Sequence, residues 1–178
     1  MTRYHAERPI FLWGMAGVGK STVGRQLALS TSRDFIDLDD EITRESGREV
    51  DEIFANSGET EFRRLEALTL KKRLAQPEPL VISLGGGALL DNALRRDARS
   101  TGTVVYLKGT VDTLMQRLGN SHQRPLLVGE DLRSRVEETL TRRITAYQDT
   151  DLHIVTDGKT SEMVSREIAD MLESERAA

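Results

Sequence analysis

Short apolar runs recur along this chain of 178 residues. The run at 79–84 is almost wholly apolar, as expected of a strand that is buried on both faces of a sheet. The run at 10–13 is equally brief and ends at Gly14, which favours a strand rather than a helix. The expected strands are residues 10–13, 35–39, 79–84, 103–107 and 152–156.

Longer stretches with helical spacing separate these runs, and Gly47 and Gly58 are expected to end two of the helices. The expected helices are residues 23–29, 41–46, 50–55, 59–75, 90–99, 111–118, 133–147 and 161–172. Two of them have apolar side chains expected to face the core: Phe62, Leu65, Leu68 and Leu74 in the fourth, and Met163, Val164, Ile168 and Met171 in the last.

The alternation of strands and helices predicts the α/β class, because parallel strands need long crossover connections. We expect a five-stranded parallel sheet with helices on both faces, within one domain spanning 1–178. Residues 1–9 form a short polar tail with no assigned chemistry. Ligands of such a sheet bind at the carboxyl ends of its strands, so candidate chemistry is sought there.

The first expected strand leads into the sequence GMAGVGKST at 14–22, which matches the phosphate-binding pattern G-x-x-x-x-G-K-S/T. Glycines allow backbone N–H groups to surround phosphates. Lys20 supplies a charge to the β- and γ-phosphates, and Ser21 offers a hydroxyl to Mg²⁺. The alternative is a chance glycine-rich turn, which the flanking strand and helix disfavour.

The polar segment 119–132 is too long for a tight turn, and we interpret it as a mobile lid. Arg124 within it would neutralise charge in a phosphoryl-transfer transition state, and Pro125 would stiffen its approach. The alternative for Arg124 is an ordinary surface arginine.

Composition narrows the classes of partner. The 25 Lys and Arg against 29 Asp and Glu give a net charge of −4, and no basic block suggests nucleic-acid binding. The chain has no cysteine, and its 3 histidines are scattered, which excludes a thiolate or histidine-cluster metal site. No apolar run approaches the ~20 residues of a membrane span. We expect a soluble, cytoplasmic, monomeric protein with small-molecule partners.

Two aspartates follow the second strand, and the interpretation of each remains open. Asp37 fits a position near Mg²⁺, and Asp39 fits a group that orients or deprotonates an acceptor hydroxyl. Alternatively they mark a helix start, with Asp39 or Asp40 as its cap.

Arg63 and the triple glycine 85–87 are further candidates. Arg63 suits a two-pronged contact with a carboxylate, although an arginine on a helix usually lies on a solvated face. Three glycines after a buried strand let the main chain approach a ligand closely, and the alternative is a strained turn.

Several motifs in this order and spacing make the chain resemble shikimate kinase over residues 10–172: GMAGVGKST, FIDLDDEI, IFANSGETEFRRLE, VISLGGGAL, RPLL and RRITAY. The resemblance implies a P-loop fold like that of nucleoside monophosphate kinases, with strand order 2-3-1-4-5 and a lid. It implies transfer of the ATP γ-phosphoryl group to the 3-hydroxyl of shikimate, with Mg²⁺ as cofactor.

The resemblance also implies roles for individual residues. Arg63 and Arg143 would hold the carboxylate of shikimate, and Asp39 its 3-hydroxyl, with Gly85, Gly86 and Gly87 beside them. Catalytic roles fall to Lys20, Asp39 and Arg124, and the Mg²⁺ positions are Ser21 and Asp37. The implied ATP contacts are Gly17, Val18, Gly19, Lys20, Ser21, Thr22, Arg117, which would stack on adenine, and Arg124, which would close over ATP.

The chain departs from the family pattern at two places. Where the family commonly has Arg-x-Pro-Leu-Tyr, residues 143–147 are Arg-Ile-Thr-Ala-Tyr, so Arg142 is an alternative to Arg143. The segment 157–161 lacks the proline that some relatives place beside adenine. Two rival functions remain: a kinase of another hydroxylated acid such as gluconate, and a module that binds nucleotide without transferring phosphate.

Overall fold

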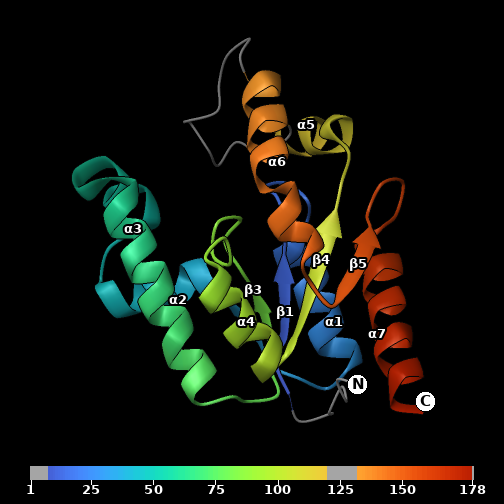
Figure 1. Ribbon diagram of the computed structural model, residues 1–178. Coiled ribbons are helices and arrows are strands. Elements are labelled where there is room, and N and C mark those ends of the chain that lie inside the picture. The colour runs from blue at the N-terminus through green and yellow to red at the C-terminus, as the bar shows by residue number, and fades with distance from the viewer. Residues whose placement is uncertain (1–7, 120–131, 178) are drawn as a thin grey trace.

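A computed structural model describes residues 8–119 and 132–177. The strands of the described part form one parallel sheet in the order β2-β3-β1-β4-β5, which confirms the predicted class and strand order (Figure 1). Most of the expected lid, with Arg124 and Pro125, and most of the N-terminal tail lie outside the described residues. The strands are β1 (Ile10–Trp13), β2 (Phe35–Asp37), β3 (Val81–Ser83), β4 (Thr103–Lys108) and β5 (Leu152–Val155).

Helices cover both faces of this sheet. The Leu12 side chain points to α1, where a Cβ on Gly24 would lie 3.3 Å from Leu12 Cδ1. The next residue, Trp13, points to the other face and packs against Tyr147 of α6. The helices are α1 (Lys20–Ser30), α2 (Leu38–Ser46), α3 (Val50–Ala75), α4 (Asn92–Thr101), α5 (Val111–Gly119), α6 (Leu132–Gln148) and α7 (Ser161–Ala177).

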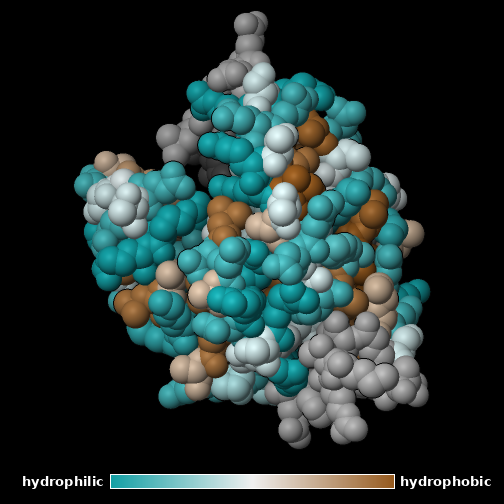
Figure 2. All heavy atoms as spheres, viewed as in Figure 1, coloured by the Kyte–Doolittle hydropathy of each residue, from teal (hydrophilic) through white to brown (hydrophobic). Residues whose placement is uncertain are grey.

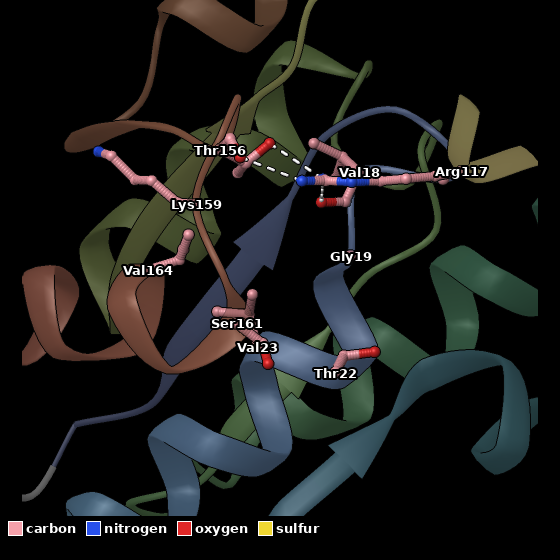
Figure 3. A pocket seen from close by; sticks show the side chains of 10 residues that line it. Val18, Gly19, Thr22, Val23, Arg117, Thr156, Lys159, Ser161 and Val164 are labelled. Carbon is pink, nitrogen blue, oxygen red and sulfur yellow. Dashed lines mark hydrogen bonds between the residues drawn. The ribbon is translucent and has the colours of Figure 1, made fainter. Parts of the chain in front are cut away.

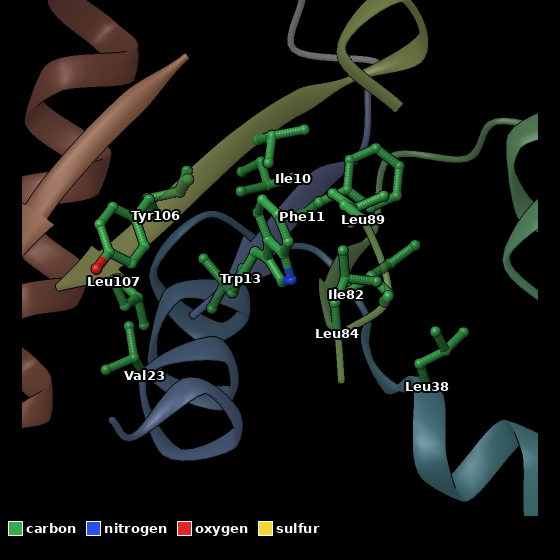
Figure 4. Packing of buried hydrophobic residues seen from close by; sticks show 14 of the residues in the cluster. Ile10, Phe11, Trp13, Val23, Leu38, Ile82, Leu84, Leu89, Tyr106 and Leu107 are labelled. Carbon is green, nitrogen blue, oxygen red and sulfur yellow. The ribbon is translucent and has the colours of Figure 1, made fainter. Parts of the chain in front are cut away.

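The core lies along the central strands. All residues of β1 and β3 are buried, as expected for parallel strands covered on both faces, and their side chains pack with those of β4 (Figure 4). At the edge, β5 alternates between buried and exposed residues. The registers pair Leu12 with Ser83 and Trp13 with Tyr106, so β1, β3 and β4 end at the same edge of the sheet.

Helices α2 and α3 pack against each other beside β2, on the left of Figure 1. Glu41 of α2 pairs with Arg73 of α3, and Glu45 pairs with Lys72 at 2.8 Å. The surface over α3 is mainly hydrophilic, and an indentation separates it from the surface over α6 (Figure 2). None of the helices within the described ranges combines the length and apolar character needed to cross a membrane.

The second strand is shorter than predicted. It ends at Asp37, whose carboxylate accepts a hydrogen bond from the backbone N–H of Asp39 at 3.1 Å and so caps α2. The cap is therefore Asp37, rather than Asp39 or Asp40, and Asp39 lies in the first helical turn. The Asp37 carboxylate satisfies a backbone N–H group in the first turn of the helix. The helix therefore begins directly after Asp37, and the strand cannot continue to residue 39.

Two predicted core positions were wrong. Leu68 is 44% exposed and Met163 is 53% exposed. The buried face of α3 instead follows the spacing of Phe62, Glu66 and Thr69. The charged residue Glu66 therefore lies on the buried face of the helix, where an apolar residue is expected. The predicted break at Gly58 is present, since its φ of 79° and ψ of 174° interrupt the helical backbone of α3.

Candidate active site

The phosphate loop connects β1 to α1 at the carboxyl edge of the sheet. Gly14 has a φ of 148°, and a Cβ there would lie 2.5 Å from the carbonyl oxygen of Leu107, so only glycine fits. Lys20 Nζ donates hydrogen bonds to the carbonyl oxygens of Gly14 at 3.1 Å and Met15 at 3.0 Å. The lysine charge is thus fixed at the loop, and the first turn of α1 contains no acidic side chain to compete for an anion.

Ser21 and Asp37 bring oxygen atoms together beside this loop. The Ser21 hydroxyl donates to Asp37 Oδ2 at 2.6 Å and lies 3.3 Å from the hydroxyl of Ser83. Mg²⁺ prefers oxygen ligands and is commonly held by one or two protein groups together with phosphates and water. The hydroxyl and carboxylate present here therefore fit that ion, and they are the two residues expected to hold it.

A cavity of about 370 Å³ lies beside the loop, between α1, α5 and the start of α7 (Figure 3). Arg117 of α5 is fixed at its edge, because its guanidinium group donates to Val18 O at 2.8 Å and to Thr156 O at 3.0 Å. A fixed guanidinium plane suits stacking on a nucleotide base. The cavity is lined by Gly17, Val18, Gly19, Thr22, Val23, Arg117, Thr156, Lys159, Ser161 and Val164.

Each glycine of the triple-glycine turn faces a different charged side chain. A Cβ on Gly85 would lie 2.1 Å from Glu66 Oε1, one on Gly86 would lie 3.0 Å from an Arg143 guanidinium nitrogen, and one on Gly87 would lie 2.6 Å from Arg63 Cζ. None of the three has a positive φ. None of the three glycines therefore has the left-handed backbone that side chains avoid, and a side chain at any of them would displace the charged group that faces it.

Asp39 lies at the same turn, since its Oδ1 would be 3.7 Å from a Cβ on Gly85. Arg63 donates to Glu66 Oε2 at 2.7 Å and to Glu59 Oε1 at 3.2 Å, so two carboxylates hold its guanidinium group. The structure thus brings together the predicted residues Asp39, Arg63 and Arg143. Arg142 instead is 67% exposed and lies near Glu138.

Glu66 is the residue of this site that sequence reasoning missed. Its side chain is only 2% exposed, and burial raises the pKa of its carboxyl above the usual range. The nearby Asp39 carboxylate adds to this rise in pKa, whereas Arg63 opposes it. The available signal was a glutamate one helical turn after Arg63, on the face that also carries Phe62.

Comparisons with known proteins identify the family of this chain. The family model described as shikimate kinase matches residues 16–173. The chain belongs to the shikimate kinase family. The curated shikimate kinase of Chlorobaculum parvum is 43% identical over 171 residues, which cover 89% of this chain and 91% of that protein. The shikimate kinase of Mannheimia succiniciproducens is 36% identical and covers 94% of this chain and 97% of its own.

Solved structures give the same assignment. Shikimate kinase from Acinetobacter baumannii in complex with shikimate has a TM-score of 0.89 and 32% identity, covering 96% of each chain. A gluconokinase from Sinorhizobium meliloti has a TM-score of 0.60 at 18% identity, which shows a shared fold only. The chain is therefore a kinase of the shikimate kinase family, for which ATP is the phosphoryl donor.

Besides Val23 of α1, four cavity residues were missed from the sequence: Thr156, Lys159, Ser161 and Val164. They follow β5 or begin α7, and Lys159 pairs with Glu167 at 2.5 Å. The only available signal was their position after the carboxyl end of a predicted strand, where ligands of this fold bind. Two of them, Lys159 and Ser161, lie in the segment 157–161, which lacks the proline that the family resemblance would place beside adenine.

Proposed function

We propose that this chain transfers the γ-phosphoryl group of ATP to the 3-hydroxyl of shikimate, with the acceptor held at the triple-glycine turn. The observation that supports this proposal is the convergence of Asp39, Arg63 and Arg143 on that turn. Two arginines and one carboxylate match an acceptor that carries one carboxylate and several hydroxyls. The turn follows β3, which neighbours the strand that leads into the phosphate loop.

Arg63 and Arg143 would bind the carboxylate of the acceptor, because both guanidinium groups lie against glycines of the turn. Glu59 and Glu66 hold Arg63 in place and so reduce the entropy lost when a ligand binds. Gly85, Gly86 and Gly87 leave room for these side chains. Asp39 would orient the acceptor hydroxyl and accept its proton during transfer.

The nucleotide would lie across the phosphate loop, with its base in the cavity beside Arg117. Backbone N–H groups of residues 17–22 and the Lys20 ammonium group would bind the phosphates. Ser21 and Asp37 would hold Mg²⁺, which neutralises charge on the transferring phosphoryl group. Arg124 lies outside the described residues, and its role over ATP is proposed on sequence resemblance alone.

Catalysis would consist mainly of positioning and charge stabilisation, as in other phosphoryl transfers. We propose that the chain acts as a single-domain, cytoplasmic monomer that binds neither nucleic acid nor membranes. Its net charge of −4 supports small-molecule partners over polyanions.

The test is ADP release from MgATP with shikimate, quinate and gluconate as separate acceptors. We expect release with shikimate that far exceeds the rates with the other two acids. Arg143→Ala should raise the KM for shikimate strongly, whereas the matched variant Arg142→Ala, on the exposed side of α6, should not. A wild-type protein that prefers gluconate, or that binds ATP without releasing ADP, would contradict the proposal.

A further inference from the structure

Tyr147 occupies a position that the proposed roles leave unexplained. It lies near the end of α6, one helical turn after Arg143, so both side chains leave the helix on the same side. Tyr147 is fully buried, and its hydroxyl donates a hydrogen bond to the carbonyl oxygen of Gly86 at 2.9 Å. A buried tyrosine therefore bonds directly to the main chain of the triple-glycine turn.

The same hydroxyl contacts two other parts of the site. It lies 3.5 Å from the sulfur of Met15, whose carbonyl oxygen accepts a hydrogen bond from Lys20. Burial raises the pKa of the Tyr147 phenol above its usual value, and the Arg143 guanidinium group, which also interacts with the phenol, opposes this rise. One hydroxyl thus touches the acceptor turn, the phosphate loop and an arginine of the acceptor site.

The aromatic ring is held so that the hydroxyl has a fixed position. It stacks on Tyr106 of β4 with centroids 4.9 Å apart, and the Trp13 ring packs edge-on at 4.6 Å. The position of the hydroxyl therefore depends on the core of the sheet rather than on the ligand.

Fixing the Gly86 carbonyl also fixes the orientation of the peptide unit that joins Gly86 to Gly87. Because the peptide unit is planar and trans, the N–H of Gly87 points opposite to the carbonyl that Tyr147 binds. The carbonyl oxygens of Gly85 and Gly87 accept hydrogen bonds from Ala88 N at 3.1 Å and Leu90 N at 3.2 Å, and the Tyr147 hydroxyl holds the carbonyl between them. The Tyr147 hydroxyl thereby sets the directions in which the Gly86 carbonyl and the Gly87 N–H group point.

We propose that the Tyr147 hydroxyl is a positioning group for phosphoryl transfer, which holds the Gly86 turn and Arg143 in register with the phosphate loop. This inference rests on the proposed function, because it assumes that the turn binds the acceptor. It differs from a packing role, since the ring alone would suffice for packing. The hydroxyl acts on the acceptor side, so its loss affects shikimate rather than ATP.

The test is Tyr147→Phe, which keeps the ring and removes the hydroxyl. We expect kcat/KM for shikimate to fall about 5- to 10-fold, the size of one lost buried hydrogen bond, with the KM for ATP within about twofold of wild type. Tyr106→Phe removes a hydroxyl from the stacked ring of the same cluster and is the matched control, expected to retain wild-type kcat/KM.

A second measurement uses Trp13, the single tryptophan of the chain, which packs on Tyr147. Shikimate binding without ATP, followed by Trp13 fluorescence, should be weaker in Tyr147→Phe than in Tyr106→Phe. Equal binding and equal kcat/KM in the two variants would overturn the inference, as would equal increases in both KM values. A wild-type protein that is inactive with shikimate would instead overturn the proposed function.

Discussion

The hydroxyl of Ser21 and the carboxylate of Asp37 lie 2.6 Å apart, although they begin α1 and cap α2. Asp37 uses both of its oxygens, since Oδ1 accepts from the backbone of Asp39 while Oδ2 accepts from Ser21. One carboxylate therefore connects the phosphate loop to the helix that carries Asp39. A substitution of Asp37 that keeps the helix cap but removes the charge can therefore distinguish a role at Mg²⁺ from a role as a helix cap.

Asp37→Asn should keep the cap, because asparagine caps helices about as well as aspartate, but it removes the charge beside Ser21. We expect the Mg²⁺ concentration for half-maximal rate to rise about 10- to 100-fold, with a melting temperature near that of wild type. Asp91→Asn is the matched control, since Asp91 caps α4 by accepting from Leu94 N at 2.9 Å. Unchanged Mg²⁺ dependence in Asp37→Asn would contradict the assignment.

Asp39→Asn tests the proposed proton acceptor. An amide cannot accept the hydroxyl proton, so kcat with shikimate should fall by roughly 10²–10⁴. The fold should hardly change, because the helix cap is Asp37. The control is Asp40→Asn, an exposed neighbour in the same helical turn. Steady-state kinetics and thermal melting decide the matter, and a near-normal kcat in Asp39→Asn would reject its catalytic role.

Gly85→Ala should damage both the fold and the acceptor site. The new methyl group would lie 2.1 Å from Glu66 Oε1, and overpacking of this kind costs about 1–3 kcal/mol in the free energy of unfolding. We expect a lower melting temperature and weaker shikimate binding. Gly119→Ala serves as control, because a Cβ there has no neighbour within 4 Å among the residues that the structure describes. Equal stability of the two variants, measured by urea denaturation, would argue against the contact.

Glu66→Gln tests the buried carboxyl through the pH dependence of stability. Burial raises the pKa of Glu66 above its usual 4.5, so the folded protein binds this proton more tightly than the unfolded chain does. The resulting stability is fully present below the unfolded pKa and is lost as pH rises through the folded pKa. Glutamine does not ionise. The melting temperature of Glu66→Gln should therefore rise relative to that of the wild type as pH increases from the unfolded pKa to the folded pKa.

Glu61→Gln is the control for that experiment, because hydrogen bonding to Arg64 lowers the pKa of Glu61. Its stability relative to wild type should move in the opposite direction, or hardly at all, as pH increases. The same pH trend in both glutamine variants would show that burial of Glu66 is not the cause. Shikimate KM should rise only in Glu66→Gln, since Arg63 loses the negative charge of its partner at 2.7 Å.

The sequence predicts those parts of the site that depend on local backbone chemistry. The phosphate loop is one, because its glycines, Lys20 and Ser21 are contiguous and stand between a strand and a helix. The strand order followed from the family resemblance, and the structure confirms it. Arg63, Arg143 and the triple glycine are separated along the chain, and their convergence was expected only from that resemblance.

The remaining features depend on packing that no local pattern encodes. A glutamate at position 66 gives no sign that it is buried, because its partners Arg63 and Gly85 reach it from two segments. The end of β2 was misplaced for a related reason, since a carboxylate after apolar residues suits either a strand end or a helix cap. Leu68 shows the converse error, in which an apolar residue lies on the exposed side of a helix.

The contact between Gly85 and Glu66 also constrains how this protein can diverge over evolutionary time. Because a side chain at 85 would occupy the space of the Glu66 carboxylate, a larger residue at 85 requires that the Glu66 side chain move or be replaced by a smaller one. Loss of Glu66 first would remove a partner of Arg63. We therefore expect a change at one of these two positions to be accompanied by a change at the other.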